Sequence, residues 1–181
     1  MRLPKLTYEQ LTPEQKSAWD EVVAGPRKKM HGPFFIWLHS PELLSRGQKL
    51  GLYARYQSSL PQRLSELCIL MTAAHWKAAG EWVDHAPIAR ELGVDAEALE
   101  ALRKGLPAKF KNADEAAAYG LAQELLNKRD VSDATYARVK GVLGERGILD
   151  LIAVLGYYGL IAMSMKTFAL KPDGAVDPFA G

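Results

Sequence analysis

The longest apolar segment of the chain runs from Leu151 to Met165 and is bounded by Asp150 and Lys166. A helix that crosses a membrane needs about 20 predominantly apolar residues. This shorter segment therefore predicts a buried helix and no membrane association. A helix that is apolar on every side has to be covered on every side. In a small domain, that requirement favours a homo-oligomer, in which a second subunit helps to cover the helix.

Composition narrows the possible classes of protein. The chain has 181 residues, of which 48% are hydrophobic, enough for one domain with a sizeable core. The net charge is +2, and the basic residues at 27–29 are expected to be solvated in a loop, so nucleic acid and anionic membranes are poor partners. The single cysteine, Cys68, excludes an intramolecular disulfide and a zinc site built on thiolates. Residues 1–5 lack the apolar core of a signal peptide, so a cytoplasmic location is expected.

Start and stop signals for helices occur along the whole chain, and signals for strands are scarce. Thr12, Pro13 and Gln15, for example, form a capping box with a first-turn proline. Helices are predicted over residues 12–24, 41–57, 61 to between 73 and 78, 81–92, 95–105, 112 or 114 to 128, 132–143 and 148–170. We predict a single all-α domain over residues 1–181, a bundle of seven or eight helices with its core at about 30–170 and a loosely held tail at 171–181.

Two of the predicted helices have a recognisable buried face. The helix that begins at residue 41 is expected to face inward with Leu43, Leu50 and Tyr53. The helix that begins at residue 61 has apolar residues at i, i+3 and i+4 spacing, namely Leu64, Leu67, Cys68, Met71 and Ala74. Because Cys68 follows this pattern, a packed core thiol is favoured over a nucleophile.

The segment from Ala78 to His85, AAGEWVDH, carries the first candidate for chemistry. Glu81 and His85 are four residues apart at the start of a predicted helix, so their side chains lie on one face. The helix dipole stabilises Glu81 as an anion, and His85 exchanges protons near neutral pH. The two residues are candidates for a base and an acid in a pocket walled by tryptophans. The alternative is an ordinary contact between polar residues on a wet surface.

Glu66 is the second candidate, because it lies among apolar residues. A buried carboxylate needs a partner or a raised pKa, whereas a water-facing Glu66 would need neither. A metal site is a further alternative, in which Glu81 and His85 supply two ligands and His75 or His39 completes the set. The His-Glu-x-x-His motif of zinc proteases is absent. The sequence thus favours a site without a metal.

Two long stretches of the chain carry a family resemblance. They are HGPFFIWLHSPELLSRGQKLGLYARYQSSLPQRLSELCILMTAAHWKAAGEWVDHAPIARELGV and VSDATYARVKGVLGERGILDLIAVLGYYGLIAM. Over these stretches, roughly residues 30 to 170, the chain resembles the carboxymuconolactone decarboxylase family, which includes the alkylhydroperoxidase D-like proteins. The resemblance implies an all-α, alkylhydroperoxidase D-like subunit that assembles as a homotrimer or a homohexamer.

The peroxidase branch of this family uses a glutamate, then Cys-x-x-Cys, then a histidine four residues after the second cysteine. In this chain Glu66 matches the glutamate and His85 matches the histidine. Ala78 and Glu81 stand where the two cysteines would be. Peroxide reduction through a disulfide needs an attacking thiolate and a resolving partner. We therefore expect that activity to be absent.

The remaining residues resemble the decarboxylase side of the family. This resemblance implies a cofactor-free lyase that uses acid/base catalysis on a small carboxylated lactone or a related enolisable acid. Its catalytic residues would be Glu66, Glu81 and His85. His85 would deliver the proton, Glu81 would orient His85 or act as the base, and Glu66 would set the histidine tautomer.

The substrate-binding residues are expected to be Arg55, as an anchor for a substrate carboxylate, together with His39, Trp82 and Tyr157 as pocket lining. Two alternatives stay open: an antioxidant protein of the peroxidase branch with altered chemistry, and a non-catalytic binding protein. The geometry poses one condition. A helix that ran unbroken from residue 61 to 78 would put Glu66 about 18 Å from its end. Glu66 and His85 then meet only if the helix is shorter, if the helices cross steeply or if a neighbouring subunit contributes.

Overall fold

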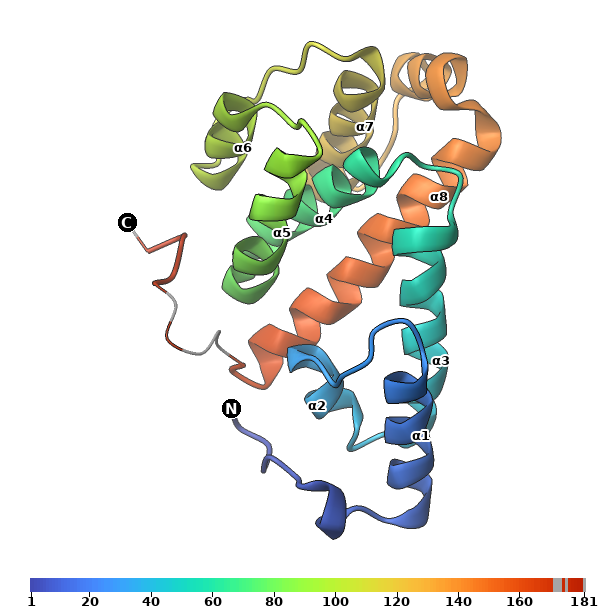
Figure 1. Cartoon of the computed structure of the whole chain (residues 1–181). Coiled ribbons are helices and arrows are strands. Elements are labelled where there is room, and N and C mark those ends of the chain that lie inside the picture. Colours follow the sequence, from blue (N-terminus) through green and yellow to red (C-terminus); the bar gives the residue numbers. More distant parts are fainter. Residues whose placement is uncertain (171–173, 175, 181) are drawn as a thin grey trace.

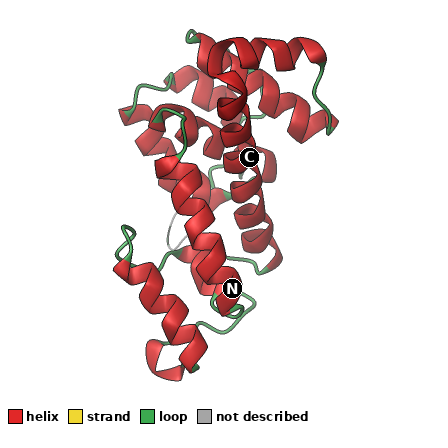
Figure 2. Cartoon of the chain, turned by 90° about the vertical axis from the view of Figure 1, so that its right-hand side faces the viewer, coloured by secondary structure: helices red, strands yellow, loops and turns green. Residues whose placement is uncertain are grey.

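The computed structural model describes residues 1–170, 174 and 176–180. Within these residues it contains eight α-helices and no strand (Figure 2), which confirms the predicted all-α fold. The helices are α1 (Pro13–Ala24), α2 (Gly32–Trp37), α3 (Pro41–Leu52), α4 (Gln62–Trp76), α5 (Ala79–Glu91), α6 (Ala96–Arg103), α7 (Ala113–Gln123) and α8 (Asp133–Thr167). A 3-10 turn at Tyr8–Gln10 precedes α1, and π-helical turns at Tyr53–Gln57 and Glu124–Lys128 extend α3 and α7.

Helix α8 runs between two groups of helices. In Figure 1, α1 to α3 lie toward the bottom of the view, α4 to α7 toward the top, and α8 passes diagonally between them. α8 contacts α2 and α3 on one side and α4 and α7 on the other. This arrangement explains why the sequence of α8 is so strongly apolar, because two layers of helices bury it.

Helix α4 is buried on every face over residues 64–73. It packs against α5, α6, α7 and α8. The predicted inward stripe is therefore only part of its buried surface, which also includes the polar residues Ser65, Glu66 and Thr72. Thr72 is satisfied locally, since its hydroxyl donates to the carbonyl of Cys68 at 3.0 Å. Glu66 has no such local partner and depends on other parts of the chain.

Helix α8 has a kink at Gly144, where φ is +69°. Glycine tolerates this left-handed conformation without steric cost, so the continuous helix consists of two helical segments. The predicted break between residues 143 and 148 is confirmed. By length and composition α8 would also pass as a membrane-crossing helix, but 61% of its most apolar window is buried inside the protein. A core helix accounts for this pattern.

One side of α8 is not covered by the described residues of its own chain. Leu149, Ile152 and Met163 are 66%, 45% and 44% exposed. Their spacing places them along one side of the helix, with the exposed Gly156 between them. We refer to Leu149, Ile152, Gly156 and Met163 as the outer face of α8. That a second subunit covers this face of the helix stays a prediction.

The predicted inward face of α3 is wrong for Leu43 and Leu50, which are exposed, because the buried side of the helix carries Leu44, Gly47 and Gly51. Tyr53, which follows α3, is half-buried, and its hydroxyl donates to the buried Asp150 at 2.6 Å. The ring of Trp37 lies only 2.8 Å from where a Cβ atom of Gly47 would be, and a Cβ atom at Gly51 would overlap the ring of Tyr157. Glycines contribute nothing to an apolar pattern, so the pattern pointed to the wrong side of the helix.

Two further segments differ from the sequence-based expectation. Helix α2 was not predicted, although Pro33 lies in its first turn and Phe34, Ile36 and Trp37 are buried. In the predicted loose tail, residues 171–173, 175 and 181 lie outside the described part of the chain. The ring of Phe179 packs against Trp82 with the ring centroids 5.5 Å apart. This part of the tail therefore contacts the helical core.

The close approach of α3 to α8 gives a test of the fold. Gly51→Ala places a methyl group against the ring of Tyr157, so we expect the free energy of unfolding to fall by about 1–3 kcal/mol, as in other overpacked cores. The measurement is urea denaturation followed by circular dichroism. Gly141→Ala is the matched control, because nothing lies within 4 Å of its Cβ position. In that helical position alanine should stabilise by about 0.5–1 kcal/mol. Equal effects of both substitutions would contradict the packing.

Candidate functional site

The turn between α4 and α5 brings the candidate residues together. Helix α4 ends at Trp76, Lys77 adopts a left-handed conformation with φ 47°, and α5 begins at Ala79. Glu66 is ten residues before the end of α4 and His85 is six residues after the start of α5, offsets of about 15 Å and 9 Å. The side chains of Glu66 and His85 span the remaining offset of about 6 Å along the helices and meet within one chain. The Glu66–His85 contact therefore needs no neighbouring subunit.

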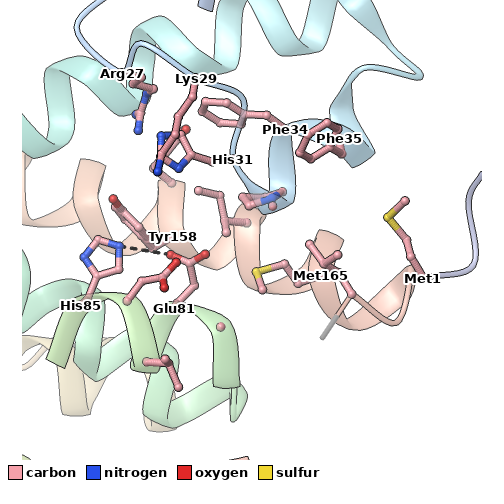
Figure 3. A pocket seen from close by; sticks show the side chains of 18 of the residues that line it. Met1, Arg27, Lys29, His31, Phe34, Phe35, Glu81, His85, Tyr158 and Met165 are labelled. Carbon is pink, nitrogen blue, oxygen red and sulfur yellow. Dashed lines mark ion pairs between the residues drawn. The ribbon is translucent and has the colours of Figure 1, made fainter. Parts of the chain in front are cut away.

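Four side chains form a line of alternating charge. Arg55 Nε donates a hydrogen bond to Glu66 Oε1 at 2.9 Å. His85 Nδ1 donates to Glu66 Oε2 at 2.6 Å. On the other side of the ring, His85 Nε2 lies 3.5 Å from Glu81 Oε2 (Figure 3, dashed line). The imidazole is thus held between two carboxylates, with Nδ1 committed to Glu66 and Nε2 directed toward Glu81.

This line of residues is shielded from water. Glu66 is 0% exposed, Glu81 is 7% exposed and His85 is 5% exposed. The alternative of a contact between polar residues on a wet surface is therefore wrong. A buried charge needs a close partner of opposite sign or multiple hydrogen bonds. Glu66 has both, since one oxygen faces a guanidinium and the other faces an imidazole.

The contacts shift two pKa values in opposite directions. Burial by itself lowers the pKa of His85, but hydrogen bonds and charge attraction from Glu66 and Glu81 outweigh it and raise the pKa above the ordinary value of 6.5. Burial by itself raises the pKa of Glu66, but His85 and Arg55 outweigh it and lower the pKa below 4.5. Both shifts favour a protonated His85 beside an ionised Glu66 at neutral pH.

The line ends at a cavity of about 1280 Å³. Glu81 and His85 form part of one wall, from α5, and Tyr158 and Met165 of α8 form its floor. The loop between α1 and α2 supplies the opposite wall, where Figure 3 shows Arg27, Lys29 and His31. The ring of His85 packs edge-on against Tyr158, with centroids 5.4 Å apart. His85 Nε2 is thus the ring nitrogen that faces the space available to a ligand.

The expected pocket residues divide into two groups. Arg55 and Tyr157 line the cavity. His39 and Trp82 do not line it, which corrects their expected place. His39 Nε2 lies 3.1 Å from the carbonyl oxygen of Pro4, and Trp82 is buried against Phe179. The geometry of α5 explains the second error, because Trp82 follows Glu81 directly and is therefore rotated by about 100° around the helix from the face shared by Glu81 and His85.

Sequence reasoning missed the basic wall of the cavity. Residues 27–29 were expected to be solvated loop residues, and His31 was not assigned a role. Lys28 and Lys29 are exposed as expected, whereas Arg27 is half-buried. Arg27, Lys29 and His31 line the cavity. The available signal was their spacing, because residues 27, 29 and 31 alternate in a short segment directly before the first turn of α2. That spacing became meaningful only once α2 was recognised as a helix packed on α8.

Cys68 does not take part in this site. It lies in the core, 0% exposed, and is not among the residues that line the cavity. Burial raises the pKa of its thiol, which disfavours the reactive thiolate. The sequence-based expectation of a packed core thiol is confirmed. In the described part of the chain, no three His, Cys, Asp or Glu side chains are grouped in a way that would hold a metal ion.

Comparisons with known proteins support the fold. No protein-family model matches the chain, and no curated protein matches its sequence. An uncharacterized peroxidase-related protein from Silicibacter sp. TM1040 has a similar structure, with a TM-score of 0.74 and 16% sequence identity over 96% of this chain and 91% of its own. A second similar structure is described as an alkylhydroperoxidase AhpD core, an uncharacterized peroxidase-related protein from Ralstonia eutropha JMP134. Its TM-score is 0.75, with 16% identity over 98% of this chain and 94% of its own.

These similarities show that the chain has the fold of the alkylhydroperoxidase D core. They extend over nearly the whole of the chain and of both neighbours, so the expected fold class is confirmed. At 16% identity they carry the fold and no more. The activity has to be argued from the site itself.

The contact between Glu66 and His85 predicts the titration of the imidazole. Glu66→Gln removes the negative charge beside Nδ1, so we expect the pKa of His85 to fall. The wild-type ring should titrate above pH 6.5, and its stabilising contribution should be complete below that pH and disappear as pH rises through its pKa. The measurement is a titration of the histidine resonances by NMR. Glu91→Gln, at the exposed end of the same helix, is the control, and an unchanged His85 in Glu66→Gln would contradict the assignment.

Proposed function

We propose that this protein is a cofactor-free lyase that acts by acid/base catalysis on a small carboxylated lactone or a related enolisable acid. The observation that supports the proposal is the position of His85, which is held between Glu66 and Glu81 with Nε2 facing a large cavity. A protonated imidazole in such a place can donate a proton to a carbon atom of a bound substrate. The resemblance to carboxymuconolactone decarboxylases supplies the reaction class.

The proposed reaction balances with the residues at hand. The bond between a carboxylate carbon and its neighbouring ring carbon breaks, CO₂ leaves, and the electron pair stays on the ring as a dienolate. His85 Nε2 then delivers its proton to the carbon atom, and water supplies the next proton to the imidazole. Glu66 keeps its negative charge throughout and fixes the orientation of the ring through Nδ1. Glu81, on the cavity side, positions the Nε2–H group or acts as the base that passes the proton from water to the imidazole.

A second candidate function is a peroxidase-related activity with altered chemistry. It is favoured by the two similar structures, both described as peroxidase-related proteins. Reduction of a peroxide by a thiol needs a reactive thiolate. The lone cysteine of this chain is buried in the core outside the cavity, and this argues for the lyase as the leading candidate. The third possibility, a binding protein without catalytic activity, would keep the cavity and lack turnover.

The proposed roles predict the effect of two substitutions on turnover of a carboxymuconolactone-type substrate. We expect His85→Ala and Glu81→Gln each to lower kcat by about 10²–10⁴-fold, the usual contribution of a positioned acid or base. Glu97→Gln, on the exposed side of α6, should leave kcat unchanged. The assay follows loss of the substrate chromophore or release of CO₂.

Other outcomes of the same assays separate the candidates. Absence of turnover by the wild-type protein would contradict the substrate assignment, and full activity in both variants would contradict the residue assignment. Thiol-dependent consumption of a peroxide that disappears in Cys68→Ser would support the peroxidase-related alternative. Ligand binding without any turnover would support the non-catalytic alternative.

We also propose that the protein is a cytoplasmic homotrimer or homohexamer, in which the outer face of α8 is covered by a second copy. The exposed Leu149, Ile152 and Met163 support this proposal, since contiguous apolar surface favours association. Ile152→Glu should lower the mass measured by light scattering toward that of one chain, 20.0 kDa. Leu106→Glu, an exposed leucine outside this face, is the control. A monomeric wild-type protein at tens of micromolar would contradict the proposal.

A further inference from the structure

The wall of the cavity that faces Glu81 and His85 carries unpaired buried hydrogen-bond donors. Nε and Nη2 of Arg27 are buried and have no hydrogen-bond partner among the described residues. The guanidinium lies over the ring of Phe34, 5.0 Å from its centroid, which fixes its plane without satisfying its N–H groups. Leaving charged donors buried and unpaired is costly. Both atoms have almost no accessible surface, so a ligand in the cavity that Arg27 lines would supply the missing acceptors once the side chain turns toward it.

Arg27 differs in this respect from the other partly buried arginines that line or support the interior. Arg55 donates to the carboxylate of Glu66 at 2.9 Å. Arg63 is paired with Asp114 at 2.7 Å and also with Glu115. Each of those guanidiniums is neutralised by carboxylates of the protein. The corresponding carboxylate for Arg27 is missing from the described residues, although the cavity beside it is open.

A second buried donor lies beside the cavity, packed against Gly51 of α3. The hydroxyl group of Tyr157 is buried and has no hydrogen-bond partner among the described residues, and the residue as a whole is 2% exposed. Burial raises the pKa of this phenol, the positive charge of Arg27 opposes the rise, and Glu81 adds to it. Tyr157 is therefore within electrostatic reach of Arg27 on one side and Glu81 on the other. It remains a neutral hydrogen-bond donor at neutral pH.

The charges around the cavity are unequal. Among the described residues, Lys5, Arg27, Lys29 and Arg55 line it, against the two carboxylates of Glu81 and Asp84, and of these cations Arg55 is already paired with Glu66. Lys29 and His31 lie beside Arg27 on the same wall (Figure 3). Burial and the two neighbouring cations lower the pKa of His31. This mutual repulsion is relieved when an anion binds between them.

The loop that carries this wall adopts an uncommon backbone conformation. Lys28, between Arg27 and Lys29, has φ +61°. A residue other than glycine in this region carries a conformational cost, and such residues concentrate at ligand sites. The loop ends at His31, the N-cap of α2, and α2 is packed on α8. The basic wall is thus attached to the same helix that carries Tyr157 and Tyr158.

We propose that Arg27, with Lys29, binds the carboxylate of a small organic anion whose apolar body lies between Phe34 and Tyr158. The other end of the ligand then reaches His85 Nε2 and Glu81 on the opposite wall (Figure 3). A guanidinium matches a carboxylate through two parallel hydrogen bonds. The inference deepens the proposed function: the anchored carboxylate is one that the substrate keeps, and the carboxylate that leaves as CO₂ is at the other end, beside His85. It moves the anchoring role from Arg55, whose Nε is already bonded to Glu66, to Arg27.

The test is calorimetric binding of an unreactive acid, phenylacetate, with its neutral analogue phenylacetamide and with inorganic phosphate. Wild-type protein should bind phenylacetate saturably and phenylacetamide at least tenfold more weakly. Arg27→Gln should weaken phenylacetate by roughly 10- to 100-fold, the loss expected for charge-assisted hydrogen bonds, and leave phenylacetamide unchanged. Arg27→Lys keeps the charge and loses the planar guanidinium, so its affinity for phenylacetate should lie between those of the wild type and Arg27→Gln. Arg138→Gln, an exposed arginine on α8 that does not line the cavity, should bind like the wild type.

Several results would overturn the proposal. They are equal affinity of wild type and Arg27→Gln for phenylacetate, equal affinity of the wild type for phenylacetate and phenylacetamide, and no binding of phenylacetate at all. If Arg55→Gln loses binding of phenylacetate and Arg27→Gln retains it, Arg55 is the residue that binds the carboxylate. If phosphate competes as strongly as phenylacetate, the site binds anions in general and is not specific for a carboxylate. Because none of these measurements needs turnover, the proposal is separable from the lyase assignment. An inactive protein that binds phenylacetate through Arg27 contradicts only the latter.

Discussion

The rest of the site depends on the two contacts that the buried carboxylate of Glu66 makes, one with Arg55 and one with His85. A carboxylate at 0% exposure is tolerated only with strong partners, and Glu66 obtains them from two distant parts of the chain. Arg55 comes from the π-helical turn after α3, and His85 comes from α5. Removal of one partner of such a group typically costs about 3–5 kcal/mol. The same contacts that make Glu66 acceptable in the core of α4 therefore hold the imidazole in place at the cavity.

The helical fold follows from local signals that the chain supplies in sequence order. The capping box of Thr12 and Gln15, the cap of Asp95 and the left-handed Gly93 and Gly105 all occur where the sequence indicates helix ends. These features act through the backbone of their neighbours, so they can be recognised without the tertiary structure. The choice of faces is different. On α3 the buried side is set by the rings of Trp37 and Tyr157, which need glycines opposite them, and no local pattern reports such a contact.

The site was predictable only where its residues are close together in the sequence. Glu81 and His85 share a helix, so their spacing alone placed them on one face. The Glu66–His85 pair was expected from the family resemblance, but spacing along the chain left open whether the two residues meet in one subunit. The position of the turn at Lys77 provides that contact. The basic wall escaped prediction because Arg27 and Lys29 lie in a segment with the composition of a solvated loop. Lys29 is exposed as expected, and only the packing of α2 on α8 places this loop beside the cavity.

The alternating charges of Arg55, Glu66, His85 and Glu81 explain why an anionic ligand would need a separate binding site for its charged end. Arg55, Glu66, His85 and Glu81 alternate in sign along the line, so the line attracts no net charge. An anionic ligand that approached His85 directly would also meet the carboxylate of Glu81, 3.5 Å from the ring nitrogen. Under the proposed function, cations on the opposite wall would reduce this conflict, because they would bind the carboxylate that the substrate keeps away from Glu81. His85 would then face the carbon atom that loses CO₂ and takes up the proton.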